Sequence, residues 1–450
     1  MDKSSEEKVL DPGLRKIYEK EINRLKPVVF IGPYEHHSND IMWREAIAEV
    51  VAIQLNHKGY IDLKDLKNTV SDPQYKERLK IGSFSAASNI TGIKSPVYEI
   101  ARIMHKYGGL VCFDYAASAP YVKINMNKDS ESFFDAIFIS PHKFVGGPGS
   151  SGILVINERI YDRTLAPTTA GGGTVDFVSR TTVDYSEDIE VRENAGTPGV
   201  LQTIKAALVI DLKDAIGIET IASKEREYTT RALMRLSKHS NIEILGPLDP
   251  KNRLSIVSFM IKHGNKKLHP KYITKLLNDL FGIQSRAGCM CAGPYGHLLL
   301  QITEEKSQQF RKIAQQGKLG FKPGWCRVNF YYLFSEVEFQ FICQSIEFIA
   351  DYGHLFLKDY SFNINSGEWV HINFKDDHIS SKPDIKTALS ANLHNCFDEE
   401  PIDQKKEFIK YLKHAKDLVQ DIGMEDDYLQ FEDSETEKLR WFNFSHTYED

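Results

Sequence analysis

The chain has 450 residues, of which 42% are hydrophobic and 26% charged, and this composition predicts a large globular domain with a smaller one. It excludes a disordered, collagen-like or disulfide-stapled chain. Six cysteines and a polar segment at residues 1–26 give no sign of secretion, so we expect a cytoplasmic protein. A net charge of −6 argues against nucleic acid, and no apolar run is long enough to cross a bilayer, which leaves a small-molecule ligand.

Short apolar runs alternate with longer amphipathic segments through roughly the first 350 residues. This pattern is typical of βαβ units and predicts a three-layer α/β/α fold with a mostly parallel sheet. The expected strands are residues 27–34, 79–86, 110–113, 136–140 and 153–156, and the expected helices are 41–55, 95–106 and 199–215. Ser95-Pro96 and Gly108-Gly109 mark the start and the end of the helix at 95–106.

A smaller α+β domain is expected after the helix at 199–215, with strands at 254–261 and 326–332 and a closing helix at 336–352. We therefore divide the chain into a polar segment (1–26), a large domain (27–220), a small domain (221–355) and an acidic extension (356–450). The extension is interpreted as a solvated segment partly docked by Trp369 and Trp441, or as an acidic segment that binds a partner.

A lysine at the end of an apolar strand is the first candidate for chemistry. The segment FISPHKFVGGPGSSG at 138–152 places Lys143 directly after that strand and before a glycine-rich stretch. In an open α/β sheet, ligands bind at the carboxyl ends of the strands, where a partly desolvated lysine amine can form an imine with a carbonyl. Ser140 and His142 could contact an anion beside it. A surface lysine before a turn would give the same pattern.

A carboxylate and an amide are expected at the same edge of the sheet. Asp114 closes the apolar strand at 110–113 and could hold a protonated pyridine nitrogen, which strengthens the ring as an electron sink. An aspartate after a strand is also an ordinary helix N-cap. Asn89 follows another expected strand and could donate a hydrogen bond to a ring hydroxyl, or could simply form a turn.

Seven motifs then occur in a familiar order along the chain. They are E-H-H-S-N at 35–39, S-N-I-T-G at 88–92, D-Y-A-A at 114–117, S-P-H-K at 140–143, N-A-G-T-P at 194–198, R-A-G-C-M-C-A at 286–292 and C-R-V-N at 326–329. With them, residues from about Pro27 to Tyr352 resemble the class V, fold-type I pyridoxal-phosphate enzymes, and among these the cysteine desulfurases. Members of this family are usually homodimers.

The resemblance implies a role for each matching residue. Lys143 would carry pyridoxal 5′-phosphate as an imine, His36 would stack on the pyridine ring and Asp114 would pair with its nitrogen. Asn89 would bond the ring oxygen. The residues implied to hold the phosphate are Ser140, His142 and, across a dimer interface, Thr197. The residues implied to bind the substrate are Arg327, as a bidentate partner of its carboxylate, and Arg286.

The segment QSRAGCMCA at 284–292 bears on which chemistry is performed. In the desulfurases a mobile loop brings a cysteine thiolate to the sulfur of the substrate, and R-x-G-x-x-C-A aligns Cys291 with that position. Cys289 lies two residues before it. The C-x-C pair could instead bind metal, although no second pair or suitably spaced histidine supports zinc, or both cysteines could be ordinary core residues. The flanking glycines favour an exposed loop.

Two features depart from the family pattern. Ala117 stands where the desulfurases usually have a glutamine near the ring oxygen. Family members also carry, before the E-H-H segment, a strand and a Gly/Thr-rich helix start that cradles the phosphate, whereas only residues 1–34 precede that segment here. We therefore expect a family member that lacks part of its large domain.

The expected function is cysteine desulfuration, in which L-cysteine gives alanine and a persulfide on Cys291 that passes to a sulfur acceptor. One alternative is a class V aminotransferase or lyase, which would need Lys143 and Asp114 but neither cysteine. A second alternative is a non-catalytic relative that binds a partner through its acidic extension or an exposed sheet edge.

Overall fold

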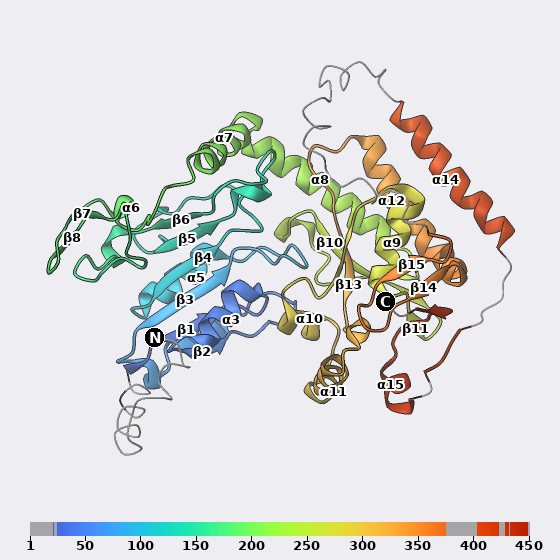
Figure 1. The fold of residues 1–450 in the computed structure, drawn as a ribbon, viewed down its shortest axis with the longest axis horizontal. Helices are drawn as coiled ribbons and strands as arrows, with labels where there is room; N and C mark the ends of the chain where they lie inside the picture. The colour runs from blue at the N-terminus through green and yellow to red at the C-terminus, as the bar shows by residue number, and fades with distance from the viewer. Residues whose placement is uncertain (1–20, 22–24, 375–402, 423–427, 432, 449–450) are drawn as a thin grey trace. The chain divides into compact units, whose positions relative to one another are not determined.

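The computed structural model describes residues 21, 25–374, 403–422, 428–431 and 433–448, so the expected polar segment at 1–26 lies almost entirely outside the described residues. The chain forms two units (Figure 1). Unit 1 contains the residues up to Asn89 together with Ile93–Lys224, and unit 2 contains Ile90–Gly92 together with the residues from Glu225 onward. The boundary near 224 falls inside α8 (Ile218–Leu236).

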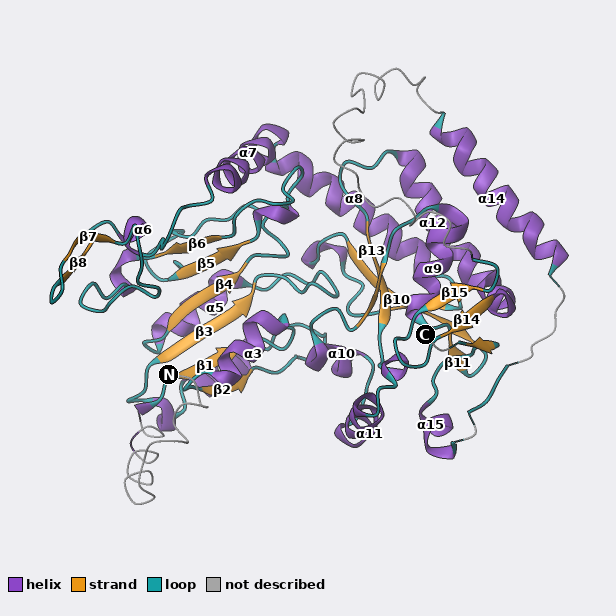
Figure 2. Ribbon diagram, viewed as in Figure 1, coloured by secondary structure: helices purple, strands orange, loops and turns teal. Residues whose placement is uncertain are grey.

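Unit 1 is built on a six-stranded sheet, whose neighbouring strands lie side by side in Figure 2. In spatial order the strands are β2 (Glu49–Ala52), β1 (Val28–Ile31), β3 (Lys80–Ser85), β4 (Leu110–Asp114), β5 (Ala136–Ile139) and β6 (Ile153–Ile156). All pairs are parallel except β5 with β6. Every residue of β1 is buried, as expected for a central strand of a parallel sheet. The mostly parallel sheet predicted from the sequence is confirmed.

The helices of unit 1 include α3 (His37–Glu45), α4 (Leu63–Val70), α5 (Val97–Lys106) and α7 (Val200–Ile216). The single helix expected at 41–55 is wrong, because α3 ends at Glu45 and residues 49–52 form β2. The β-branched residues Val50 and Val51 pair with Val29 and Phe30 of β1, so sheet pairing decides the conformation of this short segment.

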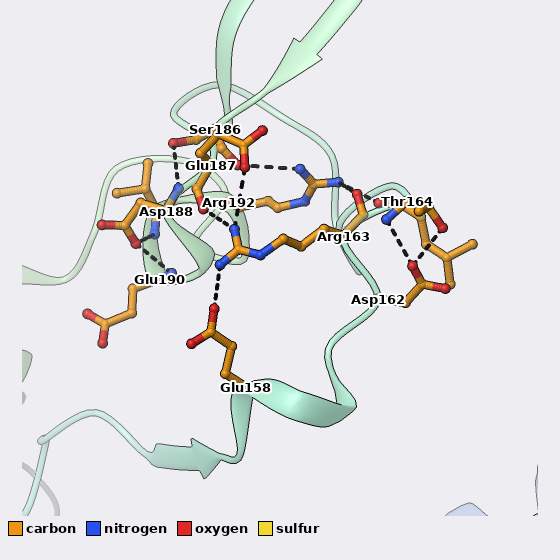
Figure 3. Close-up of polar contacts among 11 residues, drawn as sticks. Glu158, Asp162, Arg163, Thr164, Ser186, Glu187, Asp188, Glu190 and Arg192 are labelled. Carbon is orange, nitrogen blue, oxygen red and sulfur yellow. Dashed lines mark hydrogen bonds and ion pairs between the residues drawn. The ribbon is translucent and has the colours of Figure 1, made fainter.

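A segment between β6 and α7 contains the hairpin of β7 (Val175–Val178) and β8 (Val183–Tyr185), followed by α6 (Ile189–Arg192). Two arginines hold it together (Figure 3). Arg192 donates to the carbonyl oxygens of Arg163 at 2.9 Å and Leu165 at 2.6 Å, and Arg163 pairs with Glu158 at 2.7 Å. Carbonyl and carboxylate acceptors from several turns thus converge on two guanidinium groups.

Unit 2 contains a second sheet in the order β11 (Lys266–Lys267), β10 (Ile256–His263), β13 (Trp325–Asn329) and β12 (Arg286–Gly288), with β9 (Ile242–Ile244) also paired to β10. Its helices include α9 (Pro270–Phe281), α10 (Gly293–Leu299), α11 (Glu304–Gln315) and α12 (Glu336–Tyr352). α12 begins with a capping box between Ser335 and Glu338, which fixes its start at the predicted residue.

The residues after 355 belong to unit 2, which differs from the division into a separate extension. They form β14 (Tyr360–Phe362), β15 (Trp369–His371), α14 (Gln404–Asp421), α15 (Ser434–Leu439) and β16 (His446–Thr447). Phe408 of α14 stacks on Phe341 of α12 with ring centroids 4.0 Å apart, and Phe442 is fully buried. The acidic residues 398–400, 425–427 and 449–450 lie outside the described residues.

A buried histidine joins this segment to the rest of unit 2. The Nδ1 atom of His269 accepts hydrogen bonds from the Lys271 N–H at 3.2 Å and the Trp369 indole at 3.1 Å, so Nε2 carries the proton and donates to the Gly320 carbonyl at 3.1 Å. Burial lowers the pKa of His269 to about 3. Trp441 donates to the Phe321 carbonyl at 3.1 Å. Both tryptophans predicted to dock the segment make such contacts.

No helix within the described ranges combines the length and the apolar character that a bilayer crossing requires.

Candidate functional site

The candidate residues of unit 1 follow the carboxyl ends of four parallel strands. His36 comes after β1, Asn89 after β3, Asp114 at the end of β4, and Lys143 after β5. These strands are consecutive neighbours in the sheet, so their carboxyl ends meet at one edge. Such an edge is where open α/β sheets bind ligands.

Asp114 is the last residue of β4 and stands in register with Ser85 of β3 and Phe138 of β5. Its Oδ1 accepts a hydrogen bond from the Ala116 N–H at 2.7 Å. The carboxylate therefore accepts from the turn that follows, although the helix that an N-cap would start does not form there, and it remains half-buried at the sheet edge, as the cofactor role requires. The two roles are compatible because a carboxylate has further acceptor sites.

Lys143 ends a short 3₁₀ turn, Pro141–Lys143, in which Lys143 and His142 are both exposed and Ser140 is half-buried. The Lys143 N–H donates to the Ser140 carbonyl at 3.0 Å. The glycines that follow shape this turn, since a Cβ at position 147 would lie 2.0 Å from the Pro141 carbonyl oxygen. Only glycine lets the backbone return this close to the lysine turn.

The buried carboxyl group of Glu35 also lies at this edge of the sheet. No role for it was predicted from the sequence. Glu35 accepts hydrogen bonds from the Ser85 N–H at 2.9 Å, the Ser85 hydroxyl at 2.6 Å, the Gly32 N–H at 3.1 Å and the Asn39 amide at 2.6 Å. Asn39 in turn accepts from the Ser83 hydroxyl at 2.5 Å. The network ties the turn after β1 to the end of β3. In the sequence, the network is indicated only by the acidic residue that opens the E-H-H-S-N motif, directly after an apolar strand.

Burial raises the pKa of Glu35 to about 7, and the nearby negative charge of Asp114 adds to this effect. His36, the next residue, caps α3, and its Nδ1 contacts the Ser38 hydroxyl at 2.8 Å. Glu35 therefore fixes the backbone from which His36 projects, and its charge lies within electrostatic range of Asp114. The negative charge of Asp114 favours a cation at this edge, and Glu35 adds to this effect when it is ionised.

The remaining candidates of unit 1 occupy turns. Asn89 is half-buried in the turn that follows β3, where the Ser88 N–H donates to the Ile93 carbonyl at 2.8 Å. Thr197 is exposed in the bend between α6 and α7. Their expected contacts with a cofactor stay predictions.

Three candidates lie in unit 2. Arg286 of β12 and Arg327 of β13 are direct cross-strand partners in an antiparallel pair, so both side chains leave the same face of the sheet. Like charges directly opposite one another destabilise a sheet unless an anion or acid offsets them. Cys291 is half-buried and follows β12 in the turn before α10. Among the described residues, no three His, Cys, Asp or Glu side chains gather where they could hold a metal ion.

The described cysteines divide into two groups. Burial raises the pKa of Cys112, Cys326 and Cys343 to about 12, so these thiols stay protonated at neutral pH. Cys289 is exposed and Cys291 half-buried, and both lie in the turn after β12. Cys112 is half-buried as well, whereas Cys326 and Cys343 are buried, so within the described ranges Cys289 is the one thiol that is exposed.

A family model described as aminotransferase class-V matches residues 18–337, which is most of the chain. The chain belongs to the class-V aminotransferase family. The resemblance inferred from the seven motifs is confirmed, and so is the expected α/β fold class.

Curated relatives of this class-V aminotransferase family member include two bacterial proteins. A probable cysteine desulfurase from Halalkalibacterium halodurans is 32% identical over 270 residues, which cover 59% of this chain and 62% of that protein. Another from Streptomyces coelicolor is 30% identical over 266 residues, covering 59% and 61%. The chain therefore spans less than two thirds of the length of these relatives.

Solved structures show the same class-V fold. The apo cysteine desulfurase from Thermococcus onnurineus NA1 aligns with a TM-score of 0.60 and 25% identity, covering 73% of each chain. The cysteine desulfurase CsdA from Escherichia coli, solved as an S-sulfonic acid form, aligns with a TM-score of 0.57 and 21% identity over 73% of each chain, and this likeness concerns the fold alone.

Proposed function

We propose that this chain is a pyridoxal-phosphate enzyme that takes sulfur from L-cysteine, giving alanine and a persulfide on Cys291. The observation that carries the proposal is the convergence of Lys143, Asp114, Asn89 and His36 on one carboxyl edge of the sheet. The likeness to cysteine desulfurases supports the choice of substrate. A cytoplasmic location and transfer of sulfur to an acceptor protein are parts of the same proposal.

The donor set of unit 1 fits the cofactor. It offers an amine for the aldehyde, a carboxylate for the ring nitrogen, an imidazole for the ring face, and hydroxyl and imidazole groups for the phosphate. We assign these to Lys143, Asp114, His36, and Ser140 with His142. Asn89 would donate to the ring oxygen, and Thr197 would reach the phosphate of a second copy in a homodimer.

An exposed apolar face on α7 supports the homodimer. Val200, Leu201, Ile204 and Leu208 are each at least half exposed, and Leu201 reaches 77%. Such a stripe is typical of a protein–protein interface. It directly follows the bend that carries Thr197.

When bound, pyridoxal phosphate supplies an electron sink for the substrate's Cα. The Nζ of Lys143 removes the Cα proton as general base, and Asp114 keeps a proton at the ring nitrogen. Arg327 and Arg286 bind the carboxylate of the substrate. The Cys291 thiolate attacks the sulfur of the substrate, an S–S bond forms as the C–S bond breaks, and Cβ takes up a proton to give alanine.

The test has two stages. Purified protein mixed with pyridoxal phosphate should gain a visible absorption band, and borohydride reduction should fix the cofactor to Lys143, as read by peptide mass spectrometry. Lys143→Ala should abolish both. A wild-type protein that gains no band would reject the enzyme and favour the non-catalytic, partner-binding relative.

In the second stage, Cys291→Ser should lower alanine formation from L-cysteine by at least about 100-fold while leaving the visible band in place. Cys343→Ala, a change at a buried thiol, is the matched control and should keep its rate. Undiminished turnover of amino acids by the Cys291→Ser variant would favour the aminotransferase or lyase.

A further inference from the structure

The C-x-C motif forms a tight turn with unusual backbone angles. The Ala292 N–H donates to the Cys289 carbonyl at 3.3 Å, which closes the four-residue turn from 289 to 292. Met290 and Cys291, its two central residues, have φ angles of 52° and 58°. Positive φ at both positions is the signature of a type I′ turn, which normally contains asparagine and glycine. Neither is present, so the turn is strained.

The turn has one anchored residue between two thiols of different exposure. The side chain of Met290 is buried, with 5% of its surface exposed. Cys291 is half-buried, whereas Cys289 is exposed. The preceding Gly288 has a φ of 106° and is the last residue of β12, where it pairs with Trp325 of β13, so the turn starts directly from the edge of the sheet. The fold thus leaves one thiol half-buried and a second thiol exposed, with one residue between them.

The proposed function uses only the inner thiol, and a half-buried persulfide is poorly placed to meet an acceptor protein. We propose that Cys289 is a sulfur-relay cysteine, which takes the sulfur from Cys291 after alanine has formed and presents it at the surface to a thiol acceptor. This inference rests on the proposed function. Its chemistry needs two neighbouring nucleophiles, and the described chain has accessible thiols at these positions.

The transfer balances without an oxidant or a reductant. The Cys289 thiolate attacks the outer sulfur of the Cys291 persulfide, the new S–S bond forms at Cys289, and the old S–S bond breaks to release the Cys291 thiolate. The proton of the persulfide travels with the outer sulfur. Cys291 is then ready for another substrate, while the exposed persulfide on Cys289 passes to the acceptor thiol by a second exchange of the same kind.

The experiment uses the full chain loaded with pyridoxal phosphate, L-cysteine as substrate and glutathione as the acceptor probe. Alanine is measured in the first turnover, sulfur transfer as glutathione persulfide, and the position of the sulfur by rapid alkylation and peptide mass spectrometry. We expect wild-type protein to carry sulfur on Cys289 after Cys291. Cys289→Ser should form alanine in the first turnover within twofold of wild type and transfer sulfur about tenfold more slowly, with the sulfur retained on Cys291.

Cys343→Ala controls for loss of a thiol elsewhere and should match wild type in every measurement. Sulfur found on Cys291 alone in wild type, with unchanged transfer by Cys289→Ser, would overturn the relay while leaving the desulfurase intact. A disulfide between the two cysteines in place of the Cys289 persulfide would also overturn it. Failure of wild type to form any alanine would remove the proposed function, and the relay with it.

Discussion

At the scale of single residues, Glu35 is the feature with the clearest energetic signature. Four donors from Gly32, Asn39 and Ser85 surround its carboxylate, yet burial still raises its pKa to about 7 from an ordinary value of 4.5. The folded protein thus holds the Glu35 proton more tightly than the unfolded chain does. Ionising Glu35 therefore costs more free energy in the folded protein than in the unfolded chain.

This shift predicts a pH dependence of stability. Between pH 4.5 and 7 the folded state binds more protons than the unfolded state, so the contribution of Glu35 to the unfolding free energy falls as pH rises, by about 3 kcal/mol in all. Glu35→Gln lacks this titration. The unfolding free energy of the variant minus that of wild type, measured through amide exchange in β1 and β3, should therefore increase with pH over this window.

Asp135→Asn is the matched control, since Asp135 is also buried and stands before β5 at the opposite edge of the sheet. Burial opposes its ionisation, but hydrogen bonds from His105 and Arg159 lower the pKa of Asp135 below its ordinary 3.8. The unfolding free energy of Asp135→Asn minus that of wild type should stay constant from pH 4.5 to 7. If the difference for Glu35→Gln were also constant over this range, the pKa of Glu35 would not be raised in the folded protein.

At the scale of elements, the close approach of the glycine-rich stretch to the turn of Lys143 leads to a prediction about cofactor binding. A Cβ at Gly147 would stand 2.0 Å from the Pro141 carbonyl oxygen, so Gly147→Ala must displace the lysine turn. We expect pyridoxal phosphate to bind at least about tenfold more weakly, because small displacements of a reacting group are costly. Affinity would be measured by titrating the visible band.

Gly172→Ala provides the comparison within the same unit, because no atom lies within 4 Å of the added Cβ. Its cofactor affinity should equal that of wild type. Equal affinities for both alanine variants would show that the turn does not position the lysine.

Much of the sheet could be predicted from the sequence, because β1, β4 and β5 are short, mostly apolar runs with clear boundaries. The carboxylate of Asp114 and the amine of Lys143 could also be placed at one edge, since parallel strands align their carboxyl ends. β2 was missed because Glu49–Ala52 has too few residues to show a period and forms only by pairing with β1. Glu35 was missed as a network centre because two of its four donors belong to Ser85, which lies 50 residues away along the chain.

At the scale of the whole molecule, the residues after 355 complete the core of unit 2. Phe442 is fully buried and packs edge-on against His269 and Phe362 with ring centroids 4.7 and 5.1 Å apart. The same cluster includes Trp369 and Phe444. An acidic composition did not reveal this role, because a few aromatic side chains carry the packing.

Phe442→Ala should therefore lower the unfolding free energy of unit 2 by about 3–5 kcal/mol, the usual cost of removing a buried phenylalanine. Phe374→Ala, at a ring 59% exposed in the same segment, should change it by less than about 0.5 kcal/mol. Tryptophan fluorescence in urea reports on this unit, since Trp325, Trp369 and Trp441 lie in it. Equal effects of the two substitutions would show that the segment is not part of the core.

The pairing of β16 with β14 has a consequence for biosynthesis. All residues of unit 1 have been synthesised once the ribosome has passed residue 224. Unit 1 can therefore begin to fold while translation continues. Unit 2 needs Phe442, Phe444 and the strand at 446–447, which leave the exit tunnel after the other members of its core, such as Val257 and Phe259. Until then the hydrophobic residues that these side chains cover in the folded unit 2 stay exposed to solvent. Chaperones would be most needed during that interval.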